Sequence, residues 1–278
     1  MELPESWLRD QAERLVEVPG VVAVMLGGSR ARGEHSPDSD TDLGLYYRPP
    51  LDVVGLRVLA REVAGPDAEL TEVGAWGPWV DGGGWLQVGG AAVDWLYRDV
   101  DRVRAAWEDA RRGRYRFHAQ VGHPLGVPDF AYAGEVALGV VLADPSGLLS
   151  RLQQETRRYP PALSEALVSG LWEADFLLAA ARKAARRGDT AYLAGCLFRV
   201  VGVCVHALHG HAGRWLVNEK GAVRSAARLP GAPPGFAEEV GLLLGGLGTS
   251  PDQLRGAVEH AASLVATTVS ATASDPSF

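Results

Sequence analysis

The sequence predicts an α+β protein with an N-terminal mixed β-sheet domain followed by an all-helical C-terminal domain. Up to about residue 112, short valine-rich apolar runs alternate with amphipathic helical stretches. After residue 133 the apolar stretches are long and have helical periodicity. Between these parts lies a loop-rich segment with four closely spaced turn residues, Gly122, Pro124, Gly126 and Pro128. We therefore predict a first, mixed domain over residues 1–113, a linker over 114–133 and a helical second domain over 134–271.

Each element of the first domain follows from local patterning. Helices are expected where apolar residues recur every three or four positions, and strands where apolar runs are short and bounded by Gly or Pro. In chain order this predicts helix 5–18, strand 21–26, short helix 29–33, strand 41–47, helix 52–64, strands 85–88 and 92–97 as a hairpin, and helix 101–112. The same reasoning predicts helices in the second domain at 134–142, 146–158, 162–187, 190–210, 235–246 and 251–270.

Composition limits the function classes. The chain has 278 residues, 47% hydrophobic and 22% charged, which is ordinary for a globular protein. Lys and Arg total 27 against 34 Asp and Glu, so the net charge is −7. A nucleic-acid partner is not expected from this balance, whereas a cationic small molecule would be attracted. The two cysteines, Cys196 and Cys204, lie in an apolar helical stretch and are expected to be reduced and buried. No secretory signal or membrane span is predicted, so we expect a cytoplasmic protein.

The main chemical signal is a set of aspartates. Asp40 and Asp42 are two residues apart where a strand begins, so their side chains share one side of the extended chain. Two adjacent carboxylates repel each other unless a cation lies between them, and Mg²⁺ is the natural partner. Asp94 lies inside the apolar strand 92–97, where an acid is costly unless paired or metal-bound. If that strand lies beside strand 41–47, the three carboxylates converge and could hold two metal ions.

A glycine–serine turn precedes the aspartates. Gly27 and Gly28 allow a sharp turn and a close approach to a ligand. Ser29 follows where a short helix begins, and its hydroxyl and backbone N–H suit a phosphate. The phosphate and metal motifs together predict a nucleoside triphosphate bound with Mg²⁺.

This pattern resembles the nucleotidyltransferase superfamily of DNA polymerase β: Gly28-Ser29, ten residues, Asp40-x-Asp42, then the later strand aspartate Asp94. The motifs lie within residues 21–97. The resemblance implies a mixed sheet with helices on one side, and Asp40, Asp42 and Asp94 as metal ligands. It also implies that an acceptor hydroxyl attacks the α-phosphate and that pyrophosphate leaves.

The helical half resembles, in size and architecture only, the C-terminal domains of nucleotidyltransferases that modify aminoglycosides and lincosamides. This likeness implies transfer of a nucleoside monophosphate, with ATP the favoured donor, to a small hydroxylated acceptor, and a role in antibiotic resistance. In such enzymes a carboxylate beyond the catalytic sheet can act as general base. Glu135 is our candidate, followed by Glu173 and Glu219. Lys220 is the candidate contact to the triphosphate.

Several alternatives stay open. The acceptor could be a protein side chain, as in antitoxin-like members of the superfamily, or the chain could be a nucleotide sensor without turnover. Gly27-x-Ser29 also resembles a hydrolase nucleophile elbow. The site could be completed by a homodimer. Three tryptophans in a glycine-rich region, Trp76, Trp79 and Trp85, could line a pocket for substrate or base, or belong to the core. Three histidines, His206, His209 and His211, suit a helix end or the surface better than a metal site.

Overall fold

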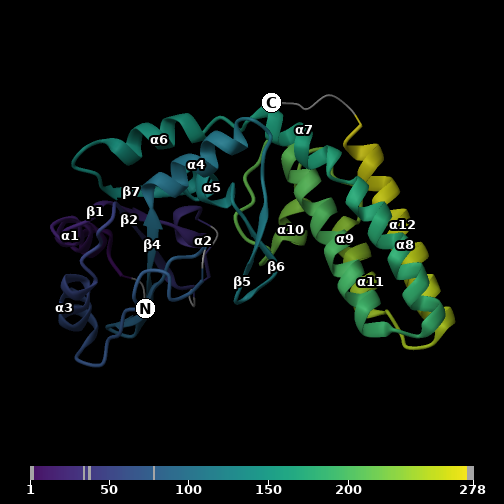
Figure 1. The fold of residues 1–278 in the computed structure, drawn as a ribbon, viewed down its shortest axis with the longest axis horizontal. Helices are drawn as coiled ribbons and strands as arrows, with labels where there is room; N and C mark the ends of the chain where they lie inside the picture. The colour runs from purple at the N-terminus through teal and green to yellow at the C-terminus, as the bar shows by residue number, and fades with distance from the viewer. Residues whose placement is uncertain (1–2, 34, 37–38, 78, 274–278) are drawn as a thin grey trace. The chain divides into compact units, whose positions relative to one another are not determined.

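The computed structural model in Figure 1 describes residues 3–33, 35–36, 39–77 and 79–273. The chain divides into two compact units. The first contains residues 1–108 and 118–158, and the second contains residues 109–117 and 159–278. Both boundaries differ from the predicted domains, because the predicted linker and residues 134–158 belong largely to the first unit.

The first unit is built on a five-stranded mixed sheet with the order β3-β4-β2-β1-β7. Only β2 and β4 run parallel to each other, and the other neighbouring pairs are antiparallel. The strands are β1 (Val21–Leu26), β2 (Thr41–Tyr47), β3 (Gly83–Val88), β4 (Ala91–Asp99) and β7 (Val140–Ala143). The predicted mixed sheet is therefore confirmed, as is the hairpin that joins β3 to β4 across Gly89 and Gly90.

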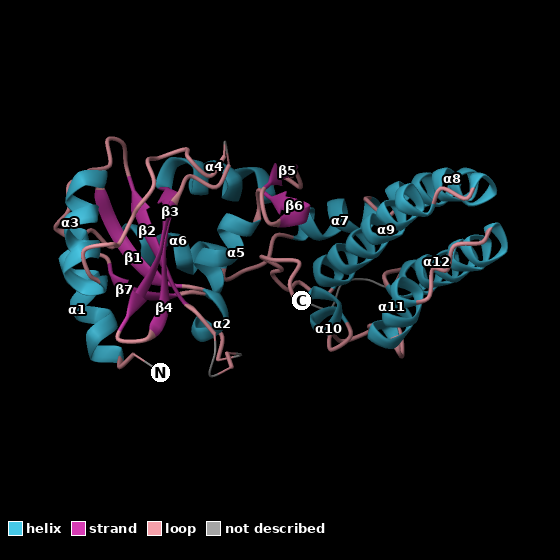
Figure 2. Cartoon of the chain, turned by 90° about the horizontal axis from the view of Figure 1, so that it is seen from below, coloured by secondary structure: helices cyan, strands magenta, loops and turns pink. Residues whose placement is uncertain are grey.

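Helices cover both faces of this sheet, as Figure 2 shows. The helices of this unit are α1 (Glu5–Val16), α2 (Gly28–Ala31), α3 (Val53–Ala64), α4 (Val100–Ala110), α5 (Ala131–Leu138) and α6 (Leu148–Thr156). One face packs its alternate apolar side chains, such as Leu43, Leu45 and Trp95, into a core with α1 and α3. Asp42 and Asp94 alternate with Leu43 and Trp95 along their strands, so they point to the other face. Helix α5 lies on that side (Figure 2). The expectation of helices on one side only is thus corrected.

The end of the first unit contains strands that sequence patterning missed. The predicted helix over 134–142 is instead the short helix α5 followed by β7, which pairs with the open edge of β1. Gly139 ends α5, and a Cβ there would lie 2.3 Å from Met25 Sδ, so glycine permits the close approach of this turn to β1. The predicted linker also contains a hairpin of β5 (Phe117–Gln120) and β6 (His123–Pro128).

The second unit is helical, as predicted. Its helices are α7 (Pro161–Ser169), α8 (Trp172–Arg187), α9 (Thr190–His211), α10 (Ala222–Ala226), α11 (Phe236–Gly245) and α12 (Pro251–Ala271). The predicted helix over 162–187 is two helices, interrupted at Gly170, where a Cβ would lie 2.8 Å from the hydroxyl of Tyr115.

The central helix α9 supplies much of the core of this unit. Cys196 and Cys204 are free and buried there, which confirms the expected thiols. By length and composition α9 is the one described helix that could cross a membrane, but most of its apolar window is buried, as in a core helix.

Candidate functional site

Asp42 and Asp94 face each other across two neighbouring strands. They are Cα partners in the parallel pair of β2 and β4. Partners in neighbouring strands point to the same face of the sheet, and the strands are about 4.8 Å apart. Both side chains are half-buried. Strands β2 and β4 are therefore neighbours, as the predicted convergence of the carboxylates requires.

The glycine turn lies directly against this pair. The backbone N–H of Gly27 donates to the carbonyl oxygen of Asp42 at 2.8 Å. Gly28 has a φ of 63°, and a Cβ on it would lie 1.7 Å from Asp42 Oδ2. No side chain fits at position 28, so the backbone of the turn approaches the carboxylate closely. Ser29 follows in the first turn of α2.

Asp40 is held at the start of β2 by an arginine that sequence reasoning did not single out. Arg30 Nε donates to the carbonyl oxygens of Ser39 and Asp40, each at 3.2 Å, and Arg30 Nη2 donates to Ser39 at 2.7 Å. These bonds tie α2 to the residues before β2. The Asp40 side chain is exposed to solvent. Arg30 follows the glycine–serine turn directly, but no pattern in the sequence shows which carbonyl groups it reaches.

Electrostatics at Asp42 favour a bound cation. Burial raises the pKa of Asp42, and the nearby negative charges of Glu135 and Asp40 raise it further, against the opposing effects of Arg98 and Arg32. The charged carboxylate is therefore incompletely compensated by the protein. A divalent cation would supply the missing positive charge.

Glu135 lies close enough to Asp42 to affect its pKa, and it is held by a buried arginine. Arg98 Nε donates to Glu135 Oε2 at 2.6 Å and Arg98 Nη2 donates to Oε1 at 2.9 Å. Arg98 lies four residues after Asp94 on β4, so both side chains point to the same face of the sheet. Burial lowers the pKa of Arg98, but the charge and hydrogen bonds of Glu135 outweigh burial and leave that pKa raised. The candidate base thus has a fixed orientation, and Arg98 is a partner that the sequence did not reveal.

The donor set fits Mg²⁺ bound together with a substrate. Within the described residues, no three His, Cys, Asp or Glu side chains form a complete metal-binding group. Mg²⁺ typically takes one or two carboxylates and completes its shell with substrate phosphates and water. Asp42 and Asp94, with Asp40 at the same end of β2, offer that kind of partial shell.

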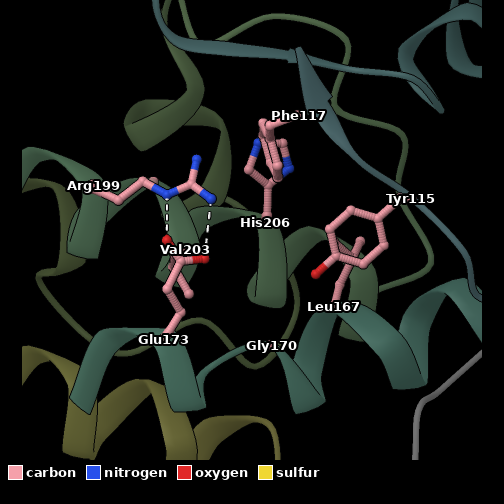
Figure 3. Close-up of a pocket in the computed structure, with 9 residues that line it drawn as sticks. Tyr115, Phe117, Leu167, Gly170, Glu173, Arg199, Val203 and His206 are labelled. Carbon is pink, nitrogen blue, oxygen red and sulfur yellow. Dashed lines mark hydrogen bonds and ion pairs between the residues drawn. The ribbon is translucent and has the colours of Figure 1, made fainter. Parts of the chain in front are cut away.

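Three predicted residues belong to the other unit. Lys220 is exposed, and its backbone N–H donates to Asn218 Oδ1 at 2.8 Å. Glu219 precedes it in the same segment. Glu173 lines a pocket among α7, α8 and α9, drawn in Figure 3, where it accepts two hydrogen bonds from Arg199, at 2.6 and 3.0 Å. The roles proposed for these residues stay predictions.

The three histidines near the end of α9 lie inside the second unit. His206, His209 and His211 are buried rather than at the surface, which corrects one expectation. Both ring nitrogens of His209 are engaged, Nδ1 with the carbonyl oxygen of Val205 at 2.9 Å and Nε2 with Ser225 Oγ at 3.0 Å. Burial, with the nearby His209 and Arg199, lowers the pKa of His206 to about 3.

Part of the first unit is similar to a known family of domains. Residues 6–72 match the family model of the nucleotidyltransferase domain. This segment includes Gly28, Ser29, Asp40 and Asp42 and ends before Asp94 and Glu135. Residues 6–72 are therefore similar to a nucleotidyltransferase domain over about a quarter of the chain.

Comparison with solved structures gives matches at low similarity. The nucleotidyltransferase-like protein from Exiguobacterium sibiricum 255-15 has a TM-score of 0.48 and 11% sequence identity, over 96% of this chain and 76% of that chain. No curated protein matches this chain.

Proposed function

We propose that this protein is a Mg²⁺-dependent nucleotidyltransferase that moves a nucleoside monophosphate, AMP from ATP, onto a hydroxyl group of a small molecule. The observation that carries the proposal is the placement of Asp42 beside Asp94, with the backbone of Gly28 packed on the Asp42 carboxylate. The glycine turn and the two carboxylates meet on one face of the sheet, beside the start of β2. That combination suits a metal–nucleotide complex.

The residues of the chain divide the chemistry between them. Asp40, Asp42 and Asp94 would hold Mg²⁺, which supplies positive charge to the phosphates when bound. Gly28 and Ser29 would contact the phosphates through backbone N–H groups and the serine hydroxyl. The acceptor oxygen forms a bond to the α-phosphorus while the bond to the pyrophosphate oxygen breaks. The proton of the acceptor hydroxyl passes to a carboxylate, for which Glu135 is the candidate because Arg98 fixes its orientation.

The proposed acceptor is a cationic polyol of the aminoglycoside or lincosamide kind. The net charge of −7 and the separate helical unit support this choice over a nucleic acid. Lys220 is the proposed additional contact to the triphosphate, and a role in antibiotic resistance and a cytoplasmic location are part of the same proposal. A protein acceptor and a nucleotide sensor are the competing functions.

A pyrophosphate-release assay tests the proposal. Each of ATP, GTP, CTP and UTP is supplied with Mg²⁺ and a panel of aminoglycosides, lincosamides and other polyols, with Asp40→Asn as the control protein. Release that requires both an acceptor and Asp40 supports a small-molecule transferase. Nucleotide binding without release across the panel contradicts the small-molecule acceptor, and it favours a protein acceptor or a sensor.

A further inference from the structure

Two tryptophans form a stacked pair at the edge of the catalytic sheet. The ring centroids of Trp76 and Trp85 are 4.6 Å apart and the rings are inclined by 21°. Trp85 is 70% exposed although it belongs to strand β3. An exposed tryptophan backed by a second one leaves a large flat apolar surface in contact with water. We refer to these two rings as the tryptophan platform.

The platform continues the row of carboxylates. Trp85 is the Cα partner of Asp94 in the antiparallel pair of β3 and β4, and Asp94 is the partner of Asp42 in the parallel pair of β4 and β2. Facing residues in neighbouring strands share a face of the sheet. The side chains of Asp42, Asp94 and Trp85 therefore follow one another across three adjacent strands. At the other end of this row, Gly27 is hydrogen-bonded to Asp42.

The loop that carries Trp76 is fixed by hydrogen bonds within the first unit. Gln120 Nε2 donates to the carbonyl oxygen of Trp76 at 2.7 Å. The carbonyl oxygen of Trp79 accepts from the Tyr132 hydroxyl at 2.5 Å and from Arg102 Nη1 at 2.6 Å.

Asp81, where the loop ends, is buried and accepts from the Tyr47 hydroxyl at 2.8 Å and from Arg102 at 2.6 Å. The platform is thus positioned before any ligand arrives, which lowers the entropy cost of binding to it.

From this arrangement we infer that the tryptophan platform binds a ring of the acceptor molecule. The inference rests on the proposed function and deepens it. In an in-line displacement, the attacking and leaving oxygens lie on opposite sides of the α-phosphorus. The glycine turn lies at one end of the row and the platform lies at the other. If the leaving pyrophosphate occupies the turn, the acceptor enters from the side of Trp85.

The chemistry of the platform defines the acceptor class. Tryptophan faces bind aryl rings and attract cationic groups placed over them. The adjacent Asp94 and Asp42 also favour positive charge. The acceptor is therefore a hydroxylated molecule with a ring whose face packs on Trp85, and an amine on or beside that ring strengthens binding.

Fluorine NMR of the full-length protein labelled with 5-fluorotryptophan tests this inference without requiring turnover. Trp85→Phe assigns the Trp85 signal. Trp172 provides an internal control because it is equally exposed, at 69%, and lies in the helical unit. The probes are phenyl β-D-glucopyranoside, a 2-deoxystreptamine aminoglycoside and a lincosamide, with glycerol as the polyol without a ring. Each is titrated with and without Mg²⁺ and α,β-methylene-ATP.

We expect at least one ring-bearing probe to shift the Trp85 signal saturably while the Trp172 signal stays unchanged, and glycerol to shift neither. The bound nucleotide analogue should leave the affinity of that probe equal or improve it. Displacement of the probe by the analogue would show that the platform holds the nucleobase, and would overturn the inference. A Trp85 signal that responds to no ring probe, or only in parallel with Trp172, would also overturn it.

Calorimetry of the nucleotide analogue separates this result from the proposed function. Absence of nucleotide binding would contradict the proposed function whatever Trp85 does. Nucleotide binding with an unresponsive Trp85 would contradict only the platform. Once an acceptor is identified by pyrophosphate release, Trp85→Ala should raise its KM at least fivefold and leave the KM for the nucleotide within twofold, and Trp85→Phe should recover most of the loss.

Discussion

Gly28 packs so closely on Asp42 that a Cβ at position 28 would lie 1.7 Å from the Asp42 carboxylate. The contact joins the two parts of the candidate site, because the turn precedes the carboxylate by fourteen positions in the chain. Neither residue can change its place without moving the other.

Replacing Gly28 with alanine should disable the site while the protein stays folded. The new methyl group must displace the Asp42 carboxylate, so we expect a loss of at least about 100-fold in kcat/KM, comparable to losing one key electrostatic contact. Gly33→Ala is the matched control. Gly33 has a similar φ, 68°, but none of the described residues lies within 4 Å of its Cβ position. Both variants carry a similar backbone cost of about 1–2 kcal/mol. Equal activity of the two variants would contradict the proposed role of the contact.

Asp42→Asn should remove activity without lowering the stability of the metal-free protein. Burial, Glu135 and Asp40 raise the pKa of Asp42, so the folded state holds this proton more tightly than the unfolded state. The free energy of unfolding of the wild type should therefore fall as pH rises from about 3.9 through the raised folded pKa. The variant should lack this fall. Chemical denaturation across that pH range, with circular dichroism detection, measures both curves.

Mg²⁺ should restore the free energy of unfolding that the wild type loses as pH rises, and it should have no such effect on Asp42→Asn. A ligand at ten times its Kd stabilises the folded state by about 1.4 kcal/mol. We expect such a gain at neutral pH for the wild type and none for Asp42→Asn. An equal gain in both proteins would place the cation elsewhere.

Glu135→Gln should be costly for stability because it leaves the buried guanidinium of Arg98 without its carboxylate. Removing one partner of a buried ion pair costs about 3–5 kcal/mol in the free energy of unfolding. Because Glu135 is partly exposed, we expect a loss at the lower end, about 3 kcal/mol. The exposed pair of Arg61 and Glu69 is the control, and Glu69→Gln should cost less than about 1 kcal/mol. Urea denaturation compares them.

The activity of Glu135→Gln distinguishes a base from a purely structural acid. If Glu135 accepts the proton, kcat of the variant falls by at least about 100-fold while the KM for the nucleotide stays unchanged. If kcat falls only in proportion to the folded fraction of the protein, Glu135 is a structural partner of Arg98.

Acid should destabilise the helical unit through His206. Burial, His209 and Arg199 lower its pKa to about 3, so the unfolded state takes up a proton that the folded state excludes. Stability should fall as pH decreases from about 6.5 toward 3, by up to about 1.4 kcal/mol per pH unit for this group. His206→Gln should reduce the slope of the free energy of unfolding against pH. Part of the slope should persist in this variant because burial also lowers the pKa of His209. Guanidinium denaturation at pH 7, 6 and 5 measures the slopes, and identical slopes would contradict the assignment.

Local patterning predicted the strands of the candidate site well and the boundary between the units poorly. The predicted ranges 21–26 and 41–47 coincide with β1 and β2, because each is a short apolar run between turn residues. The strand β7 was missed because Val140–Ala143 continues an apolar stretch that fits a helix equally well. Its strand conformation depends on the open edge of β1, more than a hundred residues earlier.

In the candidate site, too, local sequence predicted some features and tertiary structure decides the others. The types and spacing of Gly28, Asp40 and Asp42 predict a metal–phosphate site, and the metal and phosphate contacts stay predictions. The register that places Asp94 beside Asp42 and Trp85 beside Asp94 is a tertiary property, which depends on how three strands align. The hydrogen bonds of Arg98 to Glu135 and of Arg30 to Ser39 likewise depend on the tertiary structure, because no pattern in the sequence indicates these partners.

The most direct test is calorimetric titration of α,β-methylene-ATP into the wild type, Asp42→Asn and Asp94→Asn, each with Mg²⁺ and with EDTA. We predict that the wild type binds the analogue only with Mg²⁺, and that each substitution weakens binding at least tenfold while circular dichroism shows an intact fold. Equal affinity in all three proteins, or binding that is indifferent to Mg²⁺, would contradict a metal–nucleotide site at Asp42 and Asp94.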